Sequence, residues 1–154
     1  MEQFLYLPSP VGTLTLTQEG SALTGLRFGQ LSCQGVEGPT PLLEKTAQQL
    51  AEYFAGERRE FSLPLAPKGT DFQRRVWQAL LTIPYGETRT YGELAALVGN
   101  PRACRAVGGA NHRNPISILI PCHRVVGTKG ALTGYAGGLA VKEFLLKLEA
   151  GRHP

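Results

Sequence analysis

The sequence predicts an α+β fold in two parts, a small N-terminal α/β domain at residues 1–66 and a C-terminal helical domain at residues 67–154. Three observations support this division. Short apolar or alternating runs separated by Gly and Pro fill the first third, a pattern typical of antiparallel strands. From residue 70 onward the apolar residues recur at helical spacing. The prolines and the glycine of residues 64–69 mark the linker between the two patterns.

The N-terminal part contains three predicted strands and one predicted helix. The strands cover residues 4–7, 14–17 and 23–28, and residues 61–65 are a candidate for a further strand of the same sheet. Thr40 and Pro41 open the helix, with Thr40 as the N-cap and Pro41 at the first helical position. Apolar residues then recur at helical spacing until Gly56 ends the helix.

The C-terminal part begins with a predicted helix after Thr70. Its expected apolar stripe, with Trp77 in the core, consists of Phe72, Val76, Trp77, Leu80 and Leu81. Pro84-Tyr85-Gly86 breaks this helix. A second helix begins at Thr90, because Thr90 and Glu93 have the spacing of a capping box.

A third helix is expected to start at Pro101, directly after the second helix stops at Gly99-Asn100. Two short helices joined by a tight, Gly-containing turn are typical of a helix-turn-helix. Arginines lie among small residues in the third helix, at Arg102, Arg105 and Arg113. Two glycines in its middle, Gly108-Gly109, cost roughly 1 kcal/mol each relative to Ala. Either a large ligand approaches the backbone there or the helix crosses a neighbour, and the arginines favour nucleic acid as the ligand.

Composition and charge narrow the class of protein. The 154 residues are 42% hydrophobic and 18% charged, which excludes a disordered chain, a collagen-like repeat and a coiled coil. No apolar run approaches the roughly 20 residues that span a bilayer, and the N-terminus has no secretory signal pattern. Three cysteines without a disulfide spacing indicate a reducing compartment, so we expect a cytoplasmic protein.

The charge is divided unequally between the two parts. Residues 1–66 carry four basic and seven acidic residues, a net charge of −3, whereas residues 67–154 carry twelve basic and five acidic residues, a net charge of +7. A basic half of this kind suggests contact with a polyanion. A basic face kept for solubility is the alternative that charge alone leaves open.

A cysteine next to a histidine forms the candidate chemical centre. Ile118-Leu119-Ile120 is expected to be a buried strand that leads into Pro121-Cys122-His123. A free thiol has a pKa of about 8.5 and is mostly protonated at neutral pH, so a neighbouring imidazole that takes its proton would activate it. Arg124 adds positive charge nearby.

Glu149 is a candidate third member of this centre. It lies at the border of the apolar stripe of a C-terminal helix, where a carboxylate could hold the His123 ring in one tautomer. The sequence leaves open the alternative that Glu149 is a solvated residue at a helix end. Cys104 is expected to be a small helix-packing residue and Cys33 a loose thiol, and no Cys or His spacing indicates a metal site.

The chain resembles the methylated-DNA–protein-cysteine methyltransferases, the 6-O-alkylguanine-DNA alkyltransferases, at several ordered motifs. The active-site signature of this family is matched by residues 120–126, Ile-Pro-Cys-His-Arg-Val-Val. The likeness covers residues 69–151 densely and the first 66 residues in outline. Its further motifs are Tyr91, Gly99-Asn100-Pro101, Arg105-Ala106-Val107-Gly108-Gly109-Ala110, Asn114-Pro115, Gly134-Tyr135-Ala136-Gly137-Gly138 and Lys142-Glu143.

The resemblance implies a single-turnover DNA repair protein. Its N-terminal domain would be ribonuclease-H-like, and its C-terminal domain would be winged-helix-like with the helix-turn-helix in the minor groove. The damaged guanine would be flipped into a pocket, where Cys122 would take the alkyl group from 6-O-alkylguanine, or from 4-O-alkylthymine, and keep it as a thioether. The partner would be double-stranded DNA carrying alkylated guanine. The protein would act as a monomer, with cooperative binding on DNA left open, and without a cofactor, a metal ion or a membrane.

The resemblance also implies residue roles. His123 would be the base for Cys122 through a water molecule, Glu149 would orient His123, and Asn114 would fix the two halves of the site. Tyr91 would assist flipping and donate a proton to the leaving guanine, and Arg105 would replace the flipped base in the stack. The residues implied in DNA or substrate binding are Arg105, Asn100, Ala106, Gly108, Arg124, Val125, Thr128, Tyr135 and Ala136.

The chain differs from some members of the family in two respects, and two other functions are alternatives to alkyl transfer. The chain lacks plausible ligands for the N-terminal zinc of some eukaryotic relatives, and Ser117 and Ala136 stand at pocket positions that vary in the family. One alternative is a module that recognises alkylated DNA without chemistry. The other is a cysteine hydrolase built on Cys122, His123 and Glu149, which would leave the basic helix-turn-helix unexplained.

Overall fold

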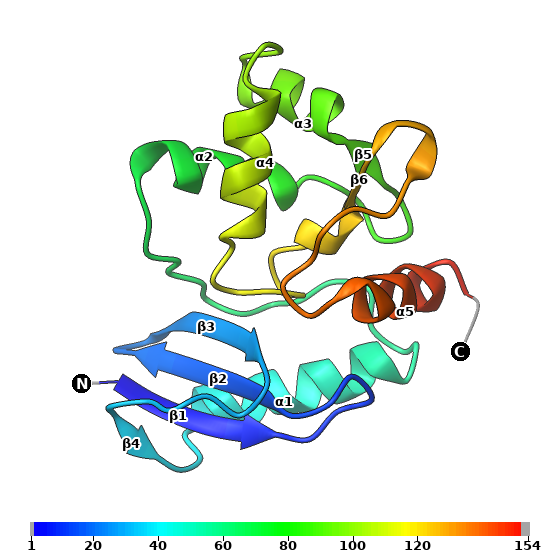
Figure 1. The fold of residues 1–154 in the computed structure, drawn as a ribbon. Coiled ribbons are helices and arrows are strands. Elements are labelled where there is room, and N and C mark those ends of the chain that lie inside the picture. The colour runs from blue at the N-terminus through cyan, green and yellow to red at the C-terminus, as the bar shows by residue number, and fades with distance from the viewer. Residues whose placement is uncertain (1, 152–154) are drawn as a thin grey trace.

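The computed structural model describes residues 2–151 and confirms the α+β fold. A strand-rich N-terminal part lies on one side of the molecule and a helical C-terminal part on the other, and helix α5 (Leu139–Glu149) lies where the two meet (Figure 1). Within residues 2–151, no helix has the length and apolar character that a membrane crossing requires.

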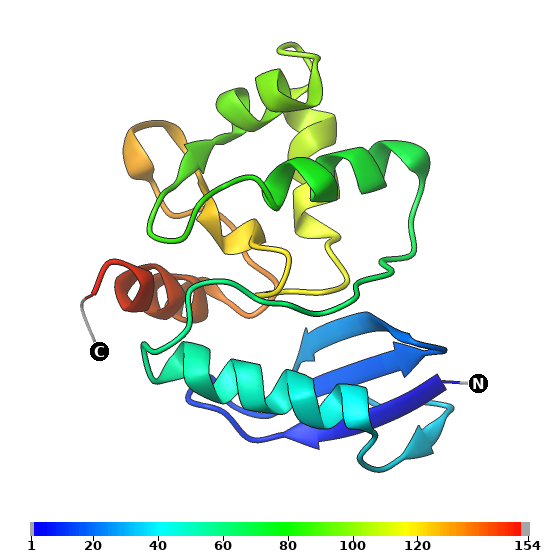
Figure 2. The ribbon, with the colours of Figure 1, turned by 180° about the vertical axis from the view of Figure 1, so that it is seen from behind.

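The N-terminal sheet has the strand order β3-β2-β1-β4. The predicted strands are confirmed as β1 (Glu2–Leu7), β2 (Leu14–Glu19) and β3 (Ala22–Phe28), which pair antiparallel. Helix α1 (Pro41–Phe54) covers one face of the sheet, and its N-cap is Thr40 as predicted (Figure 2).

The fourth strand differs from the expectation. It is β4 (Val36–Glu37), which pairs parallel with β1. Residues 61–65 do not form a strand and meet the sheet through a single bridge between Leu65 and Leu23. Pro64 and Pro67 flank this bridge and have no N–H group to extend a ladder, which explains why pairing stops there.

The C-terminal part is built from short helices and two-residue strands. The predicted capping box of Thr90 with Glu93 is present, and Gly99 ends that helix in the left-handed conformation. Thr70 forms a second capping box with Gln73, which was not predicted from the sequence. The elements are α2 (Asp71–Leu80), β5 (Arg89–Thr90), α3 (Tyr91–Val98), α4 (Cys104–His112), η1 (Cys122–Arg124), β6 (Val125–Val126), η2 (Thr128–Gly130) and α5.

Two details of the helix predictions for the C-terminal part were wrong. The third helix, α4, begins at Cys104, and Pro101 lies in the preceding turn. Arg102 and Arg113 therefore flank α4, and Arg105 is the arginine inside it. The stripe of α2 is also narrower than predicted, because Leu81 is exposed, whereas Trp77 is buried and donates its indole N–H to the Ala110 carbonyl.

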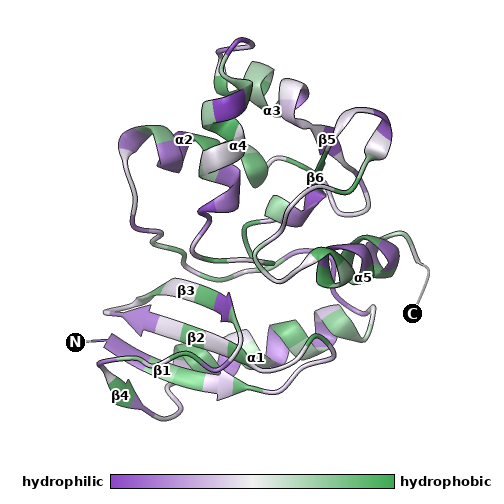
Figure 3. Cartoon of the chain, viewed as in Figure 1, coloured by the Kyte–Doolittle hydropathy of each residue, from purple (hydrophilic) through white to green (hydrophobic). Residues whose placement is uncertain are grey.

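One continuous apolar core joins the two parts. It contains residues of β2, β3 and α1 as well as residues of α2, α4 and α5, and it includes Cys122. Apolar and polar segments alternate around the helices of the C-terminal part, as amphipathic helices over a core require (Figure 3). Cys122, the candidate nucleophile, thus lies in the folded interior.

Candidate active site

Cys122 lies at the start of the short helix η1, directly after a tight turn formed by residues 116–120. The segment 118–120 was predicted as a strand, and that prediction was wrong. The Ile120 N–H donates to the Ile116 carbonyl at 3.0 Å, and the Leu119 N–H donates to the Ser117 carbonyl at 2.8 Å. Ile118 consequently has a φ of 70°, a strained conformation for a β-branched residue.

Asn114 holds this turn together. Its side-chain oxygen accepts the Ile116 N–H at 3.0 Å, and its side-chain amide donates to the Ile120 carbonyl at 2.8 Å. Asn114 is itself buried, so both backbone groups are satisfied away from water. The position of Cys122 at the end of the turn therefore depends on one amide side chain.

The Cys122 thiol is buried, with 4% of the residue exposed. Burial raises its pKa, although hydrogen bonds from Asn114 and Ser117 and the charge of Lys142 act in the opposite direction. A raised thiol pKa means that the neutral thiol predominates at pH 7, so nucleophilic chemistry at this sulfur needs a proton acceptor.

His123, the residue that follows Cys122 in the chain, forms a buried pair with Glu149. The imidazole Nε2 lies 2.6 Å from Glu149 Oε2, and His123 has no exposed surface. Burial lowers the pKa of His123, which keeps the ring neutral at pH 7 against the opposing effect of Glu149. The other ring nitrogen, Nδ1, has no hydrogen-bond partner among residues 2–151 and can accept a proton.

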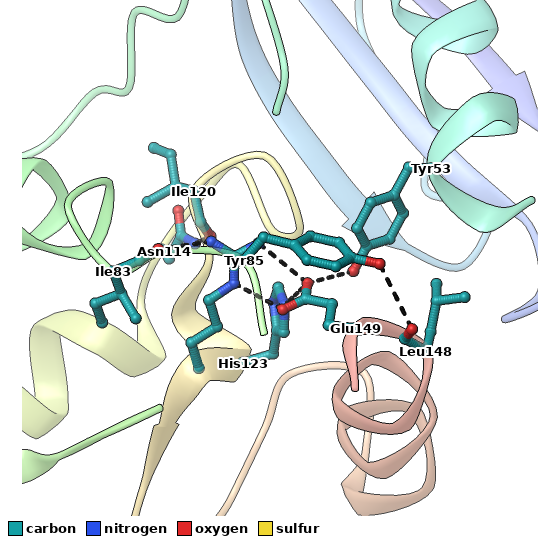
Figure 4. Close-up of polar contacts among 9 residues, drawn as sticks. Tyr53, Ile83, Tyr85, Asn114, Ile120, His123, Leu148 and Glu149 are labelled. Carbon is teal, nitrogen blue, oxygen red and sulfur yellow. Dashed lines mark hydrogen bonds and ion pairs between the residues drawn. The ribbon is translucent and has the colours of Figure 1, made fainter. Parts of the chain in front are cut away.

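The Glu149 carboxylate is held by three side chains (Figure 4). The Arg124 guanidinium donates to Oε1 at 2.8 Å and to Oε2 at 3.1 Å, and the Tyr53 hydroxyl donates to Oε2 at 2.6 Å. Burial by itself would raise the pKa of Glu149, but the hydrogen bonds from His123 and Arg124 and the charge of Arg124 outweigh it and lower the pKa to about 2. Glu149 is an ionised member of the centre, and its alternative as a solvated helix-end residue is wrong.

Arg124 has a different environment from the one expected of a DNA contact. Its guanidinium is buried, pairs with Glu149, and donates to the Ile83 carbonyl at 2.7 Å. The Tyr85 ring lies against it, with 5.8 Å between the guanidinium carbon and the ring centroid. The positive charge of Arg124 is therefore used inside the protein, and the assignment of Arg124 to DNA binding is corrected on this ground.

A second buried polar cluster surrounds Lys142 of helix α5. Its ammonium group donates to the Val125 carbonyl at 2.6 Å and lies 3.3 Å from the Thr133 hydroxyl. The Thr133 hydroxyl in turn lies 2.7 Å from the hydroxyl of Tyr91. Tyr91 and Val125 are thus joined through two residues that the sequence argument did not place in the site.

The loop at residues 134–138 lies beside the thiol. Tyr135 is buried, and this burial, together with the contact with Cys122, raises the pKa of its hydroxyl well above the usual value. Ala136 and Thr128 are exposed. From the N-terminal sheet, Phe28 packs against the Tyr135 ring, so both parts of the chain contribute to the surroundings of Cys122.

The remaining predicted binding residues lie on the outer surface of the helix-turn-helix. Asn100, Arg105 and Ala106 are exposed, and Gly108 faces Tyr91, where an added Cβ would lie 3.6 Å from the ring. Gly108 of α4 thus packs against the Tyr91 ring, and the exposed Arg105 and Ala106 lie on the same helix. Cys104 is exposed at the start of α4, so its expected packing role is wrong, and Cys33 is half-buried.

Tyr53 is a functional candidate that sequence reasoning missed, and Lys142 is one that it named only within a family motif and gave no role. Tyr53 follows Leu50 by three positions and belongs to the apolar stripe of α1, so its burial was predictable. Its contact with Glu149 spans 96 positions and has no local signal. In the part of the chain that the structure describes, no group of three or more His, Cys, Asp or Glu is arranged to hold a metal ion.

Known proteins resemble the chain over its whole length. The family model of the 6-O-methylguanine DNA methyltransferase, ribonuclease-like domain, matches residues 4–67, and that of the 6-O-methylguanine DNA methyltransferase, DNA binding domain, matches residues 71–151. A methylated-DNA–protein-cysteine methyltransferase of Methanosarcina acetivorans is 52% identical over 147 residues, which cover 92% of this chain and 94% of that protein.

Further relatives agree in sequence and in structure. The constitutive methylated-DNA–protein-cysteine methyltransferase of Bacillus subtilis is 49% identical over 158 residues, which cover 97% of this chain and 96% of that protein. A crystal structure of Mycobacterium tuberculosis OGT in complex with DNA superposes with a TM-score of 0.90 at 52% identity, over 99% of this chain and 95% of that chain.

Proposed function

The chain belongs to the 6-O-methylguanine DNA methyltransferase family, and we propose that Cys122 is the residue that accepts the alkyl group. It is a methylated-DNA–protein-cysteine methyltransferase, which binds DNA and repairs it by alkyl transfer. The observation that carries the assignment of Cys122 is its burial at the position directly before His123, whose ring pairs with the buried Glu149. Cys33 and Cys104 have no such partner among the described residues.

Formation of the thiolate is the first step. Because the Cys122 pKa is raised and that of His123 is lowered, a neutral thiol faces a neutral base. The Cys122 proton passes to His123 Nδ1 through a bridging water, which suits a nitrogen that is buried and lacks a protein partner within residues 2–151. The ionised Glu149 stabilises the imidazolium that results.

Alkyl transfer is the second step. The Cys122 thiolate attacks the alkyl carbon on O6 of guanine, so that a carbon–sulfur bond forms while the carbon–oxygen bond breaks and its electron pair moves to the purine. Tyr91 donates a proton to the leaving guanine and recovers one from solvent. The thioether has no route back to a thiol, so each molecule reacts once.

The guanine pocket is formed by residues around the thiol. Tyr135 and the Ala136 amide line it, and the Val125 carbonyl, which Lys142 holds, accepts a hydrogen bond from the exocyclic amine. Asn114 fixes the turn that presents Cys122. A base in such a pocket has left the duplex stack, which costs a few kcal/mol and least for a mispaired base.

The exposed face of the helix-turn-helix is the DNA-binding surface. Arg105 enters the base stack of the DNA in place of the flipped base. The DNA backbone lies near four further residues, Asn100, Ala106, Gly108 and Thr128. The charge of +7 on residues 67–154 supports phosphate contact by this half. On this proposal residues 67–154 are the DNA-binding and catalytic domain, residues 1–66 are a supporting domain, and the protein acts as a cytoplasmic monomer.

Intact-protein mass spectrometry tests the proposal. The protein is mixed with duplex DNA containing one 6-O-methylguanine and then digested for peptide mapping. We expect one added methyl group per molecule, on Cys122, and none in Cys122→Ala, which should still bind the DNA. Bound DNA without a mass gain would favour the recognition module instead, and repeated turnover would favour a hydrolase.

A further inference from the structure

A tyrosine of the N-terminal part reaches into the active site. Tyr53, in the last turn of α1, is completely buried and donates its hydroxyl to Glu149 Oε2 at 2.6 Å. Figure 4 shows the two side chains pointing toward each other from separate elements of the fold. The mechanism described above uses Glu149 and His123 but assigns nothing to this hydroxyl.

The position of the bond matters because Oε2 is the oxygen that contacts the imidazole. His123 Nε2 lies 2.6 Å from Oε2, and the Tyr53 hydroxyl lies at the same distance on another side. Burial and the Glu149 charge raise the pKa of Tyr53 well above 10, so the phenol keeps its proton and acts as a donor. Oε2 accepts a hydrogen bond from the phenol and belongs to a carboxylate that is paired with Arg124. It therefore carries no proton of its own.

This arrangement determines the tautomer of the base. Because Oε2 carries no proton, the short contact to His123 requires the proton to be on Nε2. The lone pair of the neutral ring is then on Nδ1, the nitrogen without a partner in the described part of the chain. The hydrogen bond from the phenol also partly neutralises the negative charge on Oε2. This weakens the electrostatic attraction between Glu149 and the imidazolium form of His123.

We propose that Tyr53 is a positioning residue for alkyl transfer, which holds Glu149 so that His123 presents an unprotonated Nδ1 and a moderated basicity to the Cys122 thiol. The proposal rests on the function inferred for Cys122. It also gives the N-terminal part a role in the chemistry, since the hydroxyl comes from α1 and its partner from α5.

A purely structural role for Tyr53 makes a different prediction. Its ring packs against Phe54, Phe61 and Tyr85, with centroid distances of 5.4, 5.3 and 6.3 Å. Tyr53→Phe keeps that ring and removes the hydroxyl alone. If packing were the whole role, this variant would react like the wild type at every pH.

The test is a single-turnover measurement of methyl transfer from 6-O-methylguanine duplex DNA across a pH series. We expect Tyr53→Phe to bind the DNA as the wild type does but to react about tenfold more slowly. A tenfold loss is a fraction of the rate enhancement that a general base supplies. The acid limb of its rate profile should move to higher pH, because Glu149 now holds the imidazolium more strongly. Tyr6→Phe is the matched control, since the Tyr6 hydroxyl donates to the exposed Leu31 carbonyl.

The outcomes separate this inference from the proposed function. An unchanged rate and pH profile in Tyr53→Phe, with a reactive wild type, would overturn the role of Tyr53 and leave that of Cys122 intact. An unreactive wild type would overturn the role of Cys122. In either case the ¹⁵N shifts of His123 in the resting wild-type protein test the tautomer directly, and a proton on Nδ1 would overturn the positioning role.

Discussion

Phe28 of the N-terminal sheet packs edge-on against Tyr135 of the loop beside Cys122, with ring centroids 5.5 Å apart and an interplanar angle of 62°. The same Phe28 ring lies over Gly137, where an added Cβ would lie 2.9 Å from the ring. The backbone of the loop thus approaches the sheet closely because residue 137 is a glycine. Together with Tyr53, this contact makes the N-terminal part a wall of the active site.

Truncation of Phe28 should therefore affect both stability and chemistry. Phe28→Ala removes a half-buried ring and an aromatic pair, so the free energy of unfolding should fall by about 2 kcal/mol. The loop at 134–138 loses its support, so methyl transfer should also slow. Denaturant unfolding and single-turnover rates measure the two effects. Phe4→Ala, in a ring pair on β1 with Tyr6, should lose stability without slowing transfer, and equal slowing in both variants would contradict the role of Phe28.

The buried ion pair of Arg124 predicts a loss of stability rather than of DNA affinity. Arg124→Met leaves the Glu149 carboxylate buried without its bidentate partner, which should cost about 3–5 kcal/mol. The slope of log affinity against log salt concentration should stay as in the wild type, because the guanidinium meets no phosphate. Denaturant unfolding and DNA titrations at several salt concentrations measure these quantities. A reduced slope would place Arg124 on the DNA after all.

Arg105 should behave in the opposite way. Its side chain is exposed on α4, so Arg105→Ala should change the free energy of unfolding by no more than about 0.5 kcal/mol. Repair of duplex DNA should slow more than alkyl transfer from the free alkylated base, since only the duplex reaction requires flipping. Parallel rate measurements on the two substrates test this, and equal slowing would show that Arg105 acts on the chemical step.

Local rules predicted most elements of this fold, and their failures have physical causes. Caps, breakers and periodicity located β1, β2, β3, α1 and α3 because these signals act within a few residues. The segment 118–120 has a strand composition, yet Asn114 and the turn bonds bend it into a strained turn. Tertiary hydrogen bonds outweigh β propensity there.

The candidate site was predictable where its residues are neighbours in sequence. Cys122 and His123 are adjacent, and the helical stripe located Glu149 near the core. Arg124 was assigned to DNA or substrate binding by the family resemblance, and its partner, 25 positions away, has no local signal in the sequence. Tyr53 was missed, and Lys142 was named in a family motif without a role, for the same reason, since each acts through a contact between elements distant in the chain.

Acid should destabilise the protein through the buried pair. The pKa of Glu149 is lowered in the folded state, to about 2 from 4.5, so its stabilising effect is complete above pH 4.5 and is lost as the pH falls toward 2. The loss amounts to roughly 3 kcal/mol. His123 adds to it below its usual value of 6.5, because the unfolded chain takes up a proton that the buried ring does not. Unfolding free energies measured from pH 7 to pH 2 should show this decline, and Glu149→Gln should remove the part below pH 4.5.

Lys142 should influence the reactivity of the thiol through its charge. Its buried ammonium lowers the pKa of Cys122, so Lys142→Met should raise that pKa and move the rise of the transfer rate to higher pH. The Val125 carbonyl also loses its donor, which should slow transfer at every pH. Single-turnover rates from pH 6 to 9 test both effects. Lys147→Met is the matched control, since Lys147 lies on the same helix, is exposed and pairs with Glu143. If the transfer rate of Lys142→Met rises over the same pH range as that of the wild type, the electrostatic effect on the thiol is contradicted. Any slowing would then come from the lost hydrogen bond to Val125 alone.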